Sequence, residues 1–544
     1  MENQNSDYIF SVESDNEGEF KDVDGDANVN VNGDNDFNPD EDDEDGSRKD
    51  CDASNPSWPQ SYRKSMDLFG SVASRSLNLL GSPRLSSSSS SSSNSSVSPK
   101  KRHNPKISSS LEKPLLQNGT DKQQIQEHHS SDHSLQPQWT SNKKLSQNQK
   151  SPKSGKSSFG QAVINGVNLL CGVGLLSTPY AANQGGWVGL SILFIFCIVS
   201  LYTGILLRYC LDSKPGLKTY PDIGEAAFGK AGRLVISIVL YVELYAACVE
   251  YIILESDNLT SLFPKAHLSF VGYQLSSPVL FAIMATIFVL PTVWLRDMSV
   301  LSYLSAGGVF VSVLLVICLY WVGLVDNIGF QTETTKMLNL STLPVAIGLY
   351  GYCYAGHAVL PNIYTSMEKR SQYPLVLLVS FAICTFLYAG VAIMGYMMFG
   401  ESIQSQFTLN LPSNFLVSKI AVWATVINPF TKYALTINPL AMSLEELIPM
   451  RSYVYSFLIR TVLVISTLIV ALTVPFFGLV MSLIGSLLTM LVSLIFPCAC
   501  FLRIVRGNVT RFQGSLCAII VTIGMVSAVF GTYTSLFEII QQLL

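Results

Sequence analysis

The fold is decided by the stretch Asn168-Leu-Leu-Cys-Gly172-Val-Gly174-Leu-Leu-Ser177-Thr178-Pro179-Tyr180, which interrupts an otherwise apolar segment. Two glycines and a proline are poor helix formers, and the proline removes a backbone hydrogen-bond donor. In a bilayer, an interrupted backbone is stable only where it lines a cavity inside the protein. The stretch therefore predicts a broken transmembrane helix beside an internal site.

A second stretch, Gly348-Leu-Tyr350-Gly351-Tyr352-Cys353-Tyr354-Ala-Gly356-His357-Ala-Val-Leu-Pro361, has the same features. Broken helices at matching places in two halves of a chain indicate the midplane site of a transporter. Half-helix N-termini offer amide donors to a carboxylate, and unwound carbonyl groups offer acceptors to an ammonium group. The alternative is that the glycines only allow close helix packing. The predicted substrate-binding residues are Gly172, Gly174, Leu175, Ser177, Tyr350, Gly351, Cys353 and Tyr354.

The chain divides into two parts of different composition. Residues 1–156 hold 24 of the 39 acids and 18 of the 35 bases, whereas the remainder is strongly apolar. Acidic, serine-rich and basic stretches cannot bury enough apolar surface to fold. We therefore predict a disordered cytosolic tail over 1–156 and a transmembrane transporter domain over 157–544. The tail is a candidate site for regulatory or sorting partners.

Apolar runs long enough to cross a bilayer recur through the second part. Open sheet edges cannot face lipid, so we expect an all-α membrane protein with eleven transmembrane helices. Breaks in the first and sixth helices fit a five-plus-five inverted repeat with one extra helix. The predicted spans are 160–183, 186–210, 231–255, 279–295, 300–324, 342–363, 374–398, 415–438, 453–473, 476–502 and 514–538.

The basic residues between the spans predict the orientation. With a cytosolic N-terminus, twelve Lys and Arg residues fall in cytosolic loops and three on the other side. Cytosolic loops of membrane proteins carry an excess of bases, so this arrangement is favoured. The C-terminus is then expected on the lumenal side.

Few ionisable residues fall inside the predicted spans, and each is a candidate for function because a charge in a bilayer is costly. The candidates for proton coupling are Glu243, Glu250, His357 and Lys432. Glu243 and Glu250 lie two turns apart on one helix face. Low dielectric favours the protonated form of a carboxyl group, so Glu243 is either a reversible proton carrier or a permanently neutral structural group.

The remaining ionisable residues in the spans have simpler interpretations. Lys432 is either a charged group that could lose its proton or a lysine that reaches the cytosolic boundary. His357 titrates near neutral pH or serves as a helix-end donor. Glu255, Arg460 and Glu538 lie near span ends and are expected to reach interfacial water.

A family resemblance adds to these patterns. The stretch from Gly172 through Pro179 to Gly185-Gly186-Trp187 resembles the first-helix signature of the amino acid/auxin permease family, and Ile253–Leu259 and Thr431–Leu435 look familial too. The acidic, serine-rich tail with Lys113-Pro-Leu-Leu116 is most like the plant and fungal vacuolar branch. The resemblance implies a LeuT-like fold, neutral amino acid substrates and proton-driven transport at the vacuole.

We therefore expect a secondary transporter that works by alternating access, with an amino acid, protons and the lipid bilayer as its partners. A sodium-coupled symporter of the same fold and an amino acid sensor signalling through its tail are the alternatives. The sequence contains no HExxH, GxSxG or P-loop motif, so no enzyme activity is expected. We expect no cofactor, no metal and no nucleic acid partner.

Overall fold

The computed structural model describes residues 58, 59, 62, 157–270, 273–295, 307–326, 328–448 and 453–544. The chain divides into two units, Met1–Asn55 and Pro56–Leu544, of which the first lies outside the described residues. Most of the predicted tail over 1–156 lies outside them too, so its disorder stays a prediction. The exceptions are Trp58, Pro59, and Tyr62.

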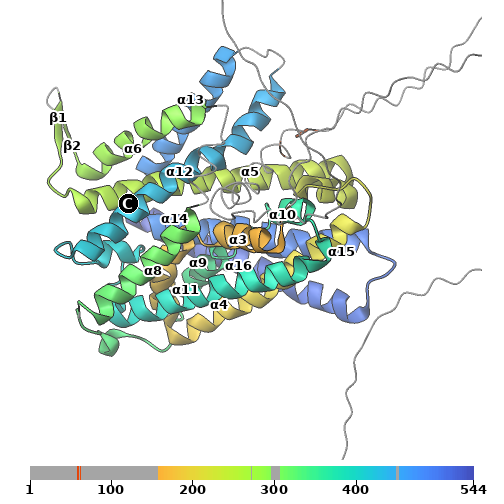
Figure 1. The fold of residues 1–544 in the computed structure, drawn as a ribbon, viewed down its shortest axis with the longest axis horizontal. Coiled ribbons are helices and arrows are strands. Elements are labelled where there is room, and N and C mark those ends of the chain that lie inside the picture. The colour runs from red at the N-terminus through yellow and green to blue at the C-terminus, as the bar shows by residue number, and fades with distance from the viewer. Residues whose placement is uncertain are drawn as a thin grey trace, which may run out of the picture. The chain divides into compact units, whose positions relative to one another are not determined.

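The described part of the chain is helical apart from one short hairpin (Figure 1). Its elements are α3 (Phe159–Leu170), α4 (Gly174–Asp212), α5 (Tyr220–Leu262), β1 (Leu268–Phe270), β2 (Tyr273–Leu275), α6 (Ser277–Trp294), α8 (Gly308–Leu324), η1 (Thr332–Thr334), α9 (Leu343–Tyr352), α10 (Leu360–Ser366), η2 (Arg370–Gln372), α11 (Tyr373–Phe399), η3 (Gly400–Ser402), η4 (Phe407–Asn410), α12 (Leu416–Leu447), α13 (Tyr453–Thr473), α14 (Phe477–Leu483), η5 (Ile484–Ile495), α15 (Phe496–Ile504) and α16 (Arg511–Leu543).

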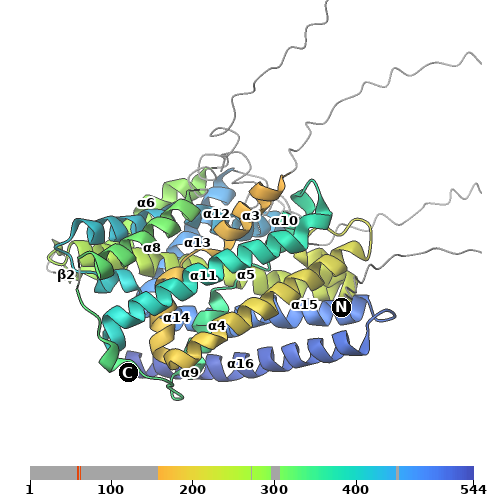
Figure 2. The ribbon, with the colours of Figure 1, turned by 60° about the horizontal axis from the view of Figure 1, so that its bottom comes forward.

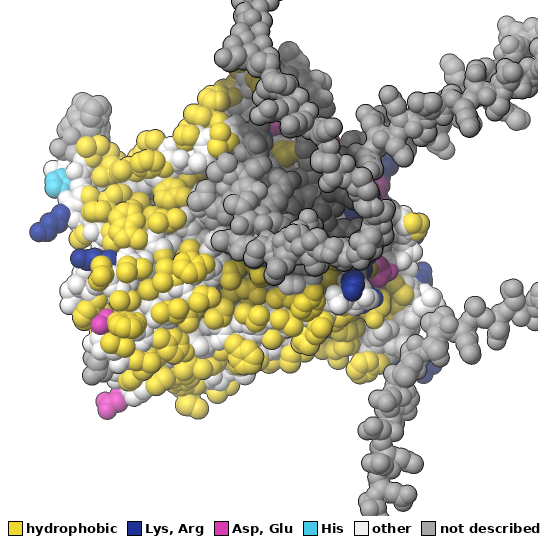
Figure 3. Space-filling view, in the orientation of Figure 1, with side chains coloured by type: hydrophobic (Ala, Val, Ile, Leu, Met, Phe, Trp, Pro, Cys, Tyr) yellow, Lys and Arg dark blue, Asp and Glu magenta, His cyan; other side chains and the backbone are white. Residues whose placement is uncertain are grey.

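Seven of the described helices are long and apolar enough to cross a membrane. Hydrophobic side chains cover much of the face in Figure 3, and the charged side chains gather toward its two ends. A belt of this kind is what a lipid-facing surface requires. Each predicted span overlaps a described helix, but the count of eleven crossings stays a prediction.

The helices pack in two groups that matter for the site. The first helix group is α3, α4, α9, α10 and α11, and α4 runs beside α11 in both Figure 1 and Figure 2. The second helix group is α5, α6, α12 and α13, which also pack on one another. The segment α14–η5–α15 packs against helices of both groups. Helix α16 packs against α9 and against that segment.

Local sequence signals explain several helix ends. Ser158, Thr219 and Thr510 each begin a helix with a capping box, in which the hydroxyl accepts from the third residue and that residue's side chain returns a hydrogen bond. Long helices bend where glycine allows left-handed backbone. Gly186, with φ +71°, lies at the boundary predicted between the first two spans, where a Cβ would meet the backbone of Met337.

Candidate functional site

Both predicted helix breaks are present in the structure. Helix α3 ends at Leu170 and α4 begins at Gly174, while α9 ends at Tyr352 and α10 begins at Leu360. Each break leaves peptide groups without the ordinary helical partner four residues away. The first helix group therefore contains two broken helices, α3–α4 and α9–α10.

The two breaks are in direct contact. A Cβ added to Gly174 would lie 3.3 Å from the Cα of Cys353, and the thiol of Cys353 is 3.8 Å from the carbonyl oxygen of Gly174. The hydroxyl of Tyr388, from α11, reaches the carbonyl oxygen of Leu170 and lies 3.2 Å from that of Cys353. One buried side chain thus binds carbonyl groups of both breaks.

A cavity of about 140 Å³ opens beside the breaks. It lies between the N-terminal side of the first break, the C-terminal side of the second, and the faces of α5 and α12. Apolar residues dominate the wall, with one acid and one base among the lining side chains. The lining residues are Asn165, Asn168, Leu169, Leu170, Gly172, Val173, Gly174, Glu243, Leu244, Ala247, Tyr251, Tyr352, Ala355, Gly356, Ala358, Val359, Ile363, Lys432 and Thr436.

Two of the predicted substrate-binding residues line this cavity, namely Gly172 and Gly174. A Cβ on Gly172 would come within 4 Å of only one atom, the carbonyl oxygen of Leu170 at 3.9 Å. This glycine therefore has open space beside it, whereas Gly174 is held against Cys353. The two glycines of the motif have different surroundings, which their spacing alone does not reveal.

The other predicted substrate-binding residues are packed behind the cavity rather than along its wall. Tyr354 stacks on Phe381 and its hydroxyl lies 2.8 Å from that of Thr385. Cys353 also reaches the carbonyl oxygen of Leu349 at 3.4 Å. Residues of this kind that are fully or almost fully buried away from the wall are Leu175, Ser177, Tyr350, Gly351, Cys353 and Tyr354.

Glu243 and Glu250, the two acids of α5 predicted to couple protons, have different surroundings. Glu243 lines the cavity and accepts a hydrogen bond from the Thr489 hydroxyl at 3.2 Å. Glu250 is fully buried, does not line the cavity, and accepts a hydrogen bond of 2.6 Å from the Tyr352 hydroxyl. Tyr352 lines the cavity, so Glu250 is joined to the wall through one side chain.

Lys432 lies in the cavity wall on α12, with 8% of its surface exposed. A Cβ added to Gly308 would meet both the ammonium nitrogen of Lys432, at 3.3 Å, and the side-chain oxygen of Asn168, at 2.6 Å. Within the described part of the chain, no acid forms an ion pair with Lys432. The lysine thus faces the N-terminal half of the first broken helix.

His357 belongs to a separate polar contact. Its Nε2 atom lies 3.0 Å from the Thr203 hydroxyl and 3.2 Å from the Ser200 carbonyl oxygen, both on α4. The side chain is fully buried and does not line the cavity. The arrangement ties the second break to α4.

The expectation that Glu255 and Arg460 reach interfacial water is wrong. Both are buried, and Arg460 pairs with Glu445 at 2.7 Å and donates to the carbonyl oxygen of Val293 at 2.8 Å. The contacts between α12, α13 and α6 enclose the guanidinium group. Proximity to a helix end does not expose a side chain when neighbouring helices extend past it.

Several cavity residues were missed by the sequence reasoning. Asn165 and Asn168 are three residues apart in an apolar helix, a spacing that places both on one face and could have indicated them. Tyr352 lies between Tyr350 and Tyr354, which were predicted instead. Which of the three tyrosines lines the cavity depends on where α9 ends. Thr489, which binds the cavity acid Glu243 but does not line the cavity, gave no signal, because it lies in the π-helix η5, whose wider turn cannot be inferred from residue types.

A membrane-spanning set of helices, with a cavity where two broken helices meet, defines a multi-pass membrane protein of the transporter class. The model of the family described as transmembrane amino acid transporter protein matches residues 155–537. The chain therefore belongs to this family, which confirms the resemblance to amino acid/auxin permeases.

Similar proteins cover most of the chain. Amino acid transporter AVT1C of Arabidopsis thaliana is 60% identical over 497 residues, which are 89% of this chain and 90% of that protein. Amino acid transporter AVT1B of the same plant is 58% identical over 489 residues, 89% of each protein. Among solved structures, MhsT in complex with L-phenylalanine matches with a TM-score of 0.44 and 13% identity, covering 68% of this chain and 98% of that one.

Proposed function

We propose that this protein is a secondary active transporter of neutral amino acids that works by alternating access. The observation that supports it most is the contact between the two helix breaks beside a cavity. Helix α4 begins at Gly174 on the cavity wall, so the positive end of its dipole is placed to bind a carboxylate. Carbonyl oxygens of the unwound segments are suitable acceptors for an ammonium group.

The lining of the cavity favours a substrate without net charge. Among the described lining residues, Glu243 and Lys432 are the only acid and base, and the others are mostly apolar. A zwitterion with an apolar side chain would satisfy the two helix breaks and leave no unpaired charge against the leucines and valines of the wall. Among the described lining residues, an acidic or basic side chain would have only Lys432 or Glu243 as a partner, and we favour these two groups for proton coupling.

Glu243 and Lys432 are the groups we favour for proton coupling, because both line the cavity. Among the described residues, Glu243 accepts a hydrogen bond from the Thr489 hydroxyl and forms no ion pair, so its carboxyl group can gain or lose a proton without breaking one. The amine of Lys432 occupies the region beside the first broken helix where a coupling cation would otherwise lie. We assign Glu250 and His357 a secondary part, as groups that transmit the state of the cavity to α9 and α4.

The membrane arrangement follows the same proposal. We propose eleven crossings in a LeuT-like repeat, with broken helices 1 and 6, so that the two termini lie on opposite sides of the membrane. The excess of basic residues in the predicted cytosolic loops favours a cytosolic N-terminus and a lumenal C-terminus. The composition of the N-terminal region, with its likeness to the vacuolar branch, points to the vacuolar membrane. Amino acids would then be moved across that membrane at the expense of a proton gradient.

Imposed gradients test the coupling directly. Purified protein in proteoliposomes is given a pH gradient or a sodium gradient, and the accumulation of a labelled neutral amino acid is followed. We expect accumulation with the pH gradient, abolished by a protonophore, and none with sodium alone. Accumulation driven by sodium at equal pH would overturn the proton assignment and favour the sodium symporter.

Glu243→Gln should separate coupling from exchange. A glutamine cannot carry a proton, so accumulation driven by the pH gradient should fall about tenfold, within the usual range of coupling between two ligands. One-for-one exchange of amino acid needs no proton movement and should change little. Both rates are measured on the same vesicles.

Glu538→Gln is the matched control for this substitution. Glu538 is a half-buried acid of α16 that does not line the cavity, so its loss should leave both rates near those of the wild type. If Glu243→Gln keeps the wild-type response to the pH gradient, the residue has no part in coupling.

A further inference from the structure

Three residues from the N-terminal region lie against the transporter helices. Trp58 donates a hydrogen bond of 3.0 Å from its indole nitrogen to the carbonyl oxygen of Ser443, on α12. The carbonyl oxygen of Pro59 accepts from Arg233, on α5, at 2.9 Å. Tyr62 is 1% exposed, and its hydroxyl donates to the carbonyl oxygen of Ala358 at 3.3 Å. We call Trp58, Pro59 and Tyr62 the N-terminal clamp.

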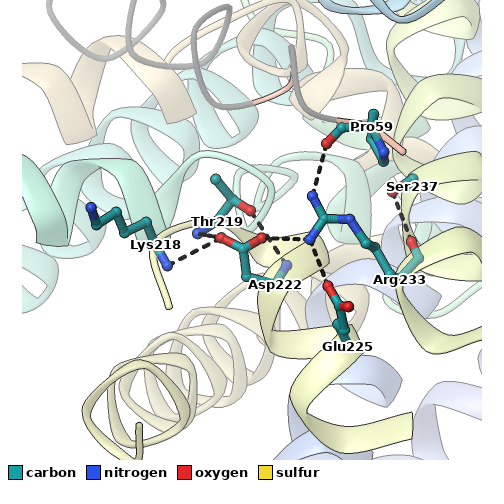
Figure 4. Close-up of polar contacts among 7 residues, drawn as sticks. All are labelled: Pro59, Lys218, Thr219, Asp222, Glu225, Arg233 and Ser237. Atoms are coloured by element: carbon teal, nitrogen blue, oxygen red, sulfur yellow. Dashed lines mark hydrogen bonds and ion pairs between the residues drawn. The ribbon is translucent and has the colours of Figure 1, made fainter. Parts of the chain in front are cut away.

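Arg233 binds the clamp, and two carboxylates hold its side chain in place (Figure 4). One guanidinium nitrogen binds Asp222 at 2.9 Å and Glu225 at 2.7 Å, which leaves the other to bind Pro59. Asp222 is fixed in turn by the backbone N–H of Thr219. The planar fork of arginine is therefore held in one orientation before the clamp binds it.

Aromatic contacts complete the clamp. The ring of Tyr241, on α5, lies 5.8 Å from the Trp58 ring and 6.0 Å from the Tyr62 ring between centroids. Such spacings are those of favourable aromatic pairs. A chain segment that only passed near the surface would not bury a tyrosine and direct its hydroxyl to a carbonyl group.

The clamp reaches the candidate site itself. Ala358, which Tyr62 binds, lines the cavity beside the second helix break. Burial raises the pKa of the Tyr62 phenol well above its usual range, so Tyr62 remains a hydrogen-bond donor to the carbonyl oxygen of Ala358.

The clamp also joins the two helix groups. Ser443, Arg233 and Tyr241 belong to α12 and α5 of the second helix group, whereas Ala358 lies between α9 and α10 of the first. Alternating access requires one group of helices to move against the other around the site. A segment bound to both groups at the wall of the cavity opposes that movement.

We infer that the N-terminal clamp is an autoinhibitory strap, which covers the cavity beside Ala358 and must be released before the protein cycles. The regulation rests on the transport function proposed above. Release would free both the approach to the cavity and the relative motion of the helix groups. The clamp is therefore the point at which events in the N-terminal region act on transport.

Cysteine labelling tests the clamp without relying on transport. The full-length protein receives Ala355→Cys, at a half-buried position of the cavity wall, and is treated with a membrane-impermeant maleimide; protein without this substitution gives the background. The combined variant Trp58→Ala/Tyr62→Ala should react at least about tenfold faster than the clamped protein, because it loses two hydrogen bonds and both ring contacts. Tyr62→Phe removes only the hydroxyl and should react at an intermediate rate.

A matched control uses the same two amino acid changes elsewhere in the N-terminal region. Tyr8→Ala/Trp139→Ala should react like the clamped protein. Equal labelling rates in the clamp variant, this control and the clamped protein would overturn the inference. Circular dichroism and size-exclusion profiles verify that the variants compared are folded.

Transport of a labelled neutral amino acid by the same variants, without Ala355→Cys, separates the regulation from the function. We expect the clamp variant to transport severalfold faster than the wild type and than the control. Faster labelling with equal transport would overturn the inhibitory role. Faster labelling of the clamp variant, with no transport by any of the proteins compared, would support the inference that the clamp covers the cavity. It would count only against the proposed transport function.

Discussion

Gly485→Ala should destabilise the folded protein by on the order of 3 kcal/mol, the upper part of the usual range for overpacking. A Cβ on Gly485 would overlap the backbone carbonyl oxygen of Gly348, where the π-helix η5 crosses α9. Neither atom is the end of a flexible side chain, so one of the two backbones must shift. We expect a lower midpoint of thermal unfolding for the purified variant.

Gly160→Ala is the control for this loss. Gly160 lies in helix α3 with nothing within 4 Å of its Cβ position, and alanine is the better helix former. Its unfolding midpoint should equal or exceed that of the wild type. A Gly485→Ala variant as stable as this control would show that the packing of α9 on η5 is looser than the structure implies.

Gly174→Leu should abolish amino acid binding. Its Cβ would lie 3.3 Å from the Cα of Cys353, and the further carbons would force the two helix breaks apart or fill the start of α4. A substrate carboxylate would then lose the amide groups proposed to bind it. Substrate-induced thermal shift and uptake, measured on monodisperse protein, should both be lost.

Gly160→Leu makes the same change where space is open, and it should bind amino acid like the wild type. The pair separates a requirement for glycine at the break from a general effect of added bulk. Wild-type binding by Gly174→Leu would mean that the glycine serves packing alone, and the site assignment would then fail.

The positions of the helix breaks were predictable from the sequence, because glycine and proline act locally. The first break, between α3 and α4, contains Gly172 and is followed by Gly174. The second break, between α9 and α10, is followed by Pro361, and Gly186 lies at the boundary predicted between the first two spans. The π-helical turn of η5 was not predictable, since its residues are ordinary apolar ones. Packing against neighbouring helices, rather than local sequence, determines where the π-helical turns form.

The residues that line the cavity were predictable only in part, because they depend on which face of each helix points into the cavity. Glu243 and Lys432 were identified since ionisable residues are rare in apolar segments, and both line the cavity. Tyr352 was passed over for Tyr350 and Tyr354, which the end of α9 turns away from the wall. The clamp residues, in a segment whose composition indicates disorder, gave no signal at all.

Counterflow tests the central claim most directly. Proteoliposomes containing the purified wild type are loaded with an unlabelled neutral amino acid, and entry of labelled neutral, acidic and basic amino acids is measured with equal pH and sodium on both sides. The account predicts rapid exchange of neutral amino acids and little of the charged ones, independent of any coupling ion. Failure to exchange any amino acid, by protein that is folded and correctly inserted, would contradict it.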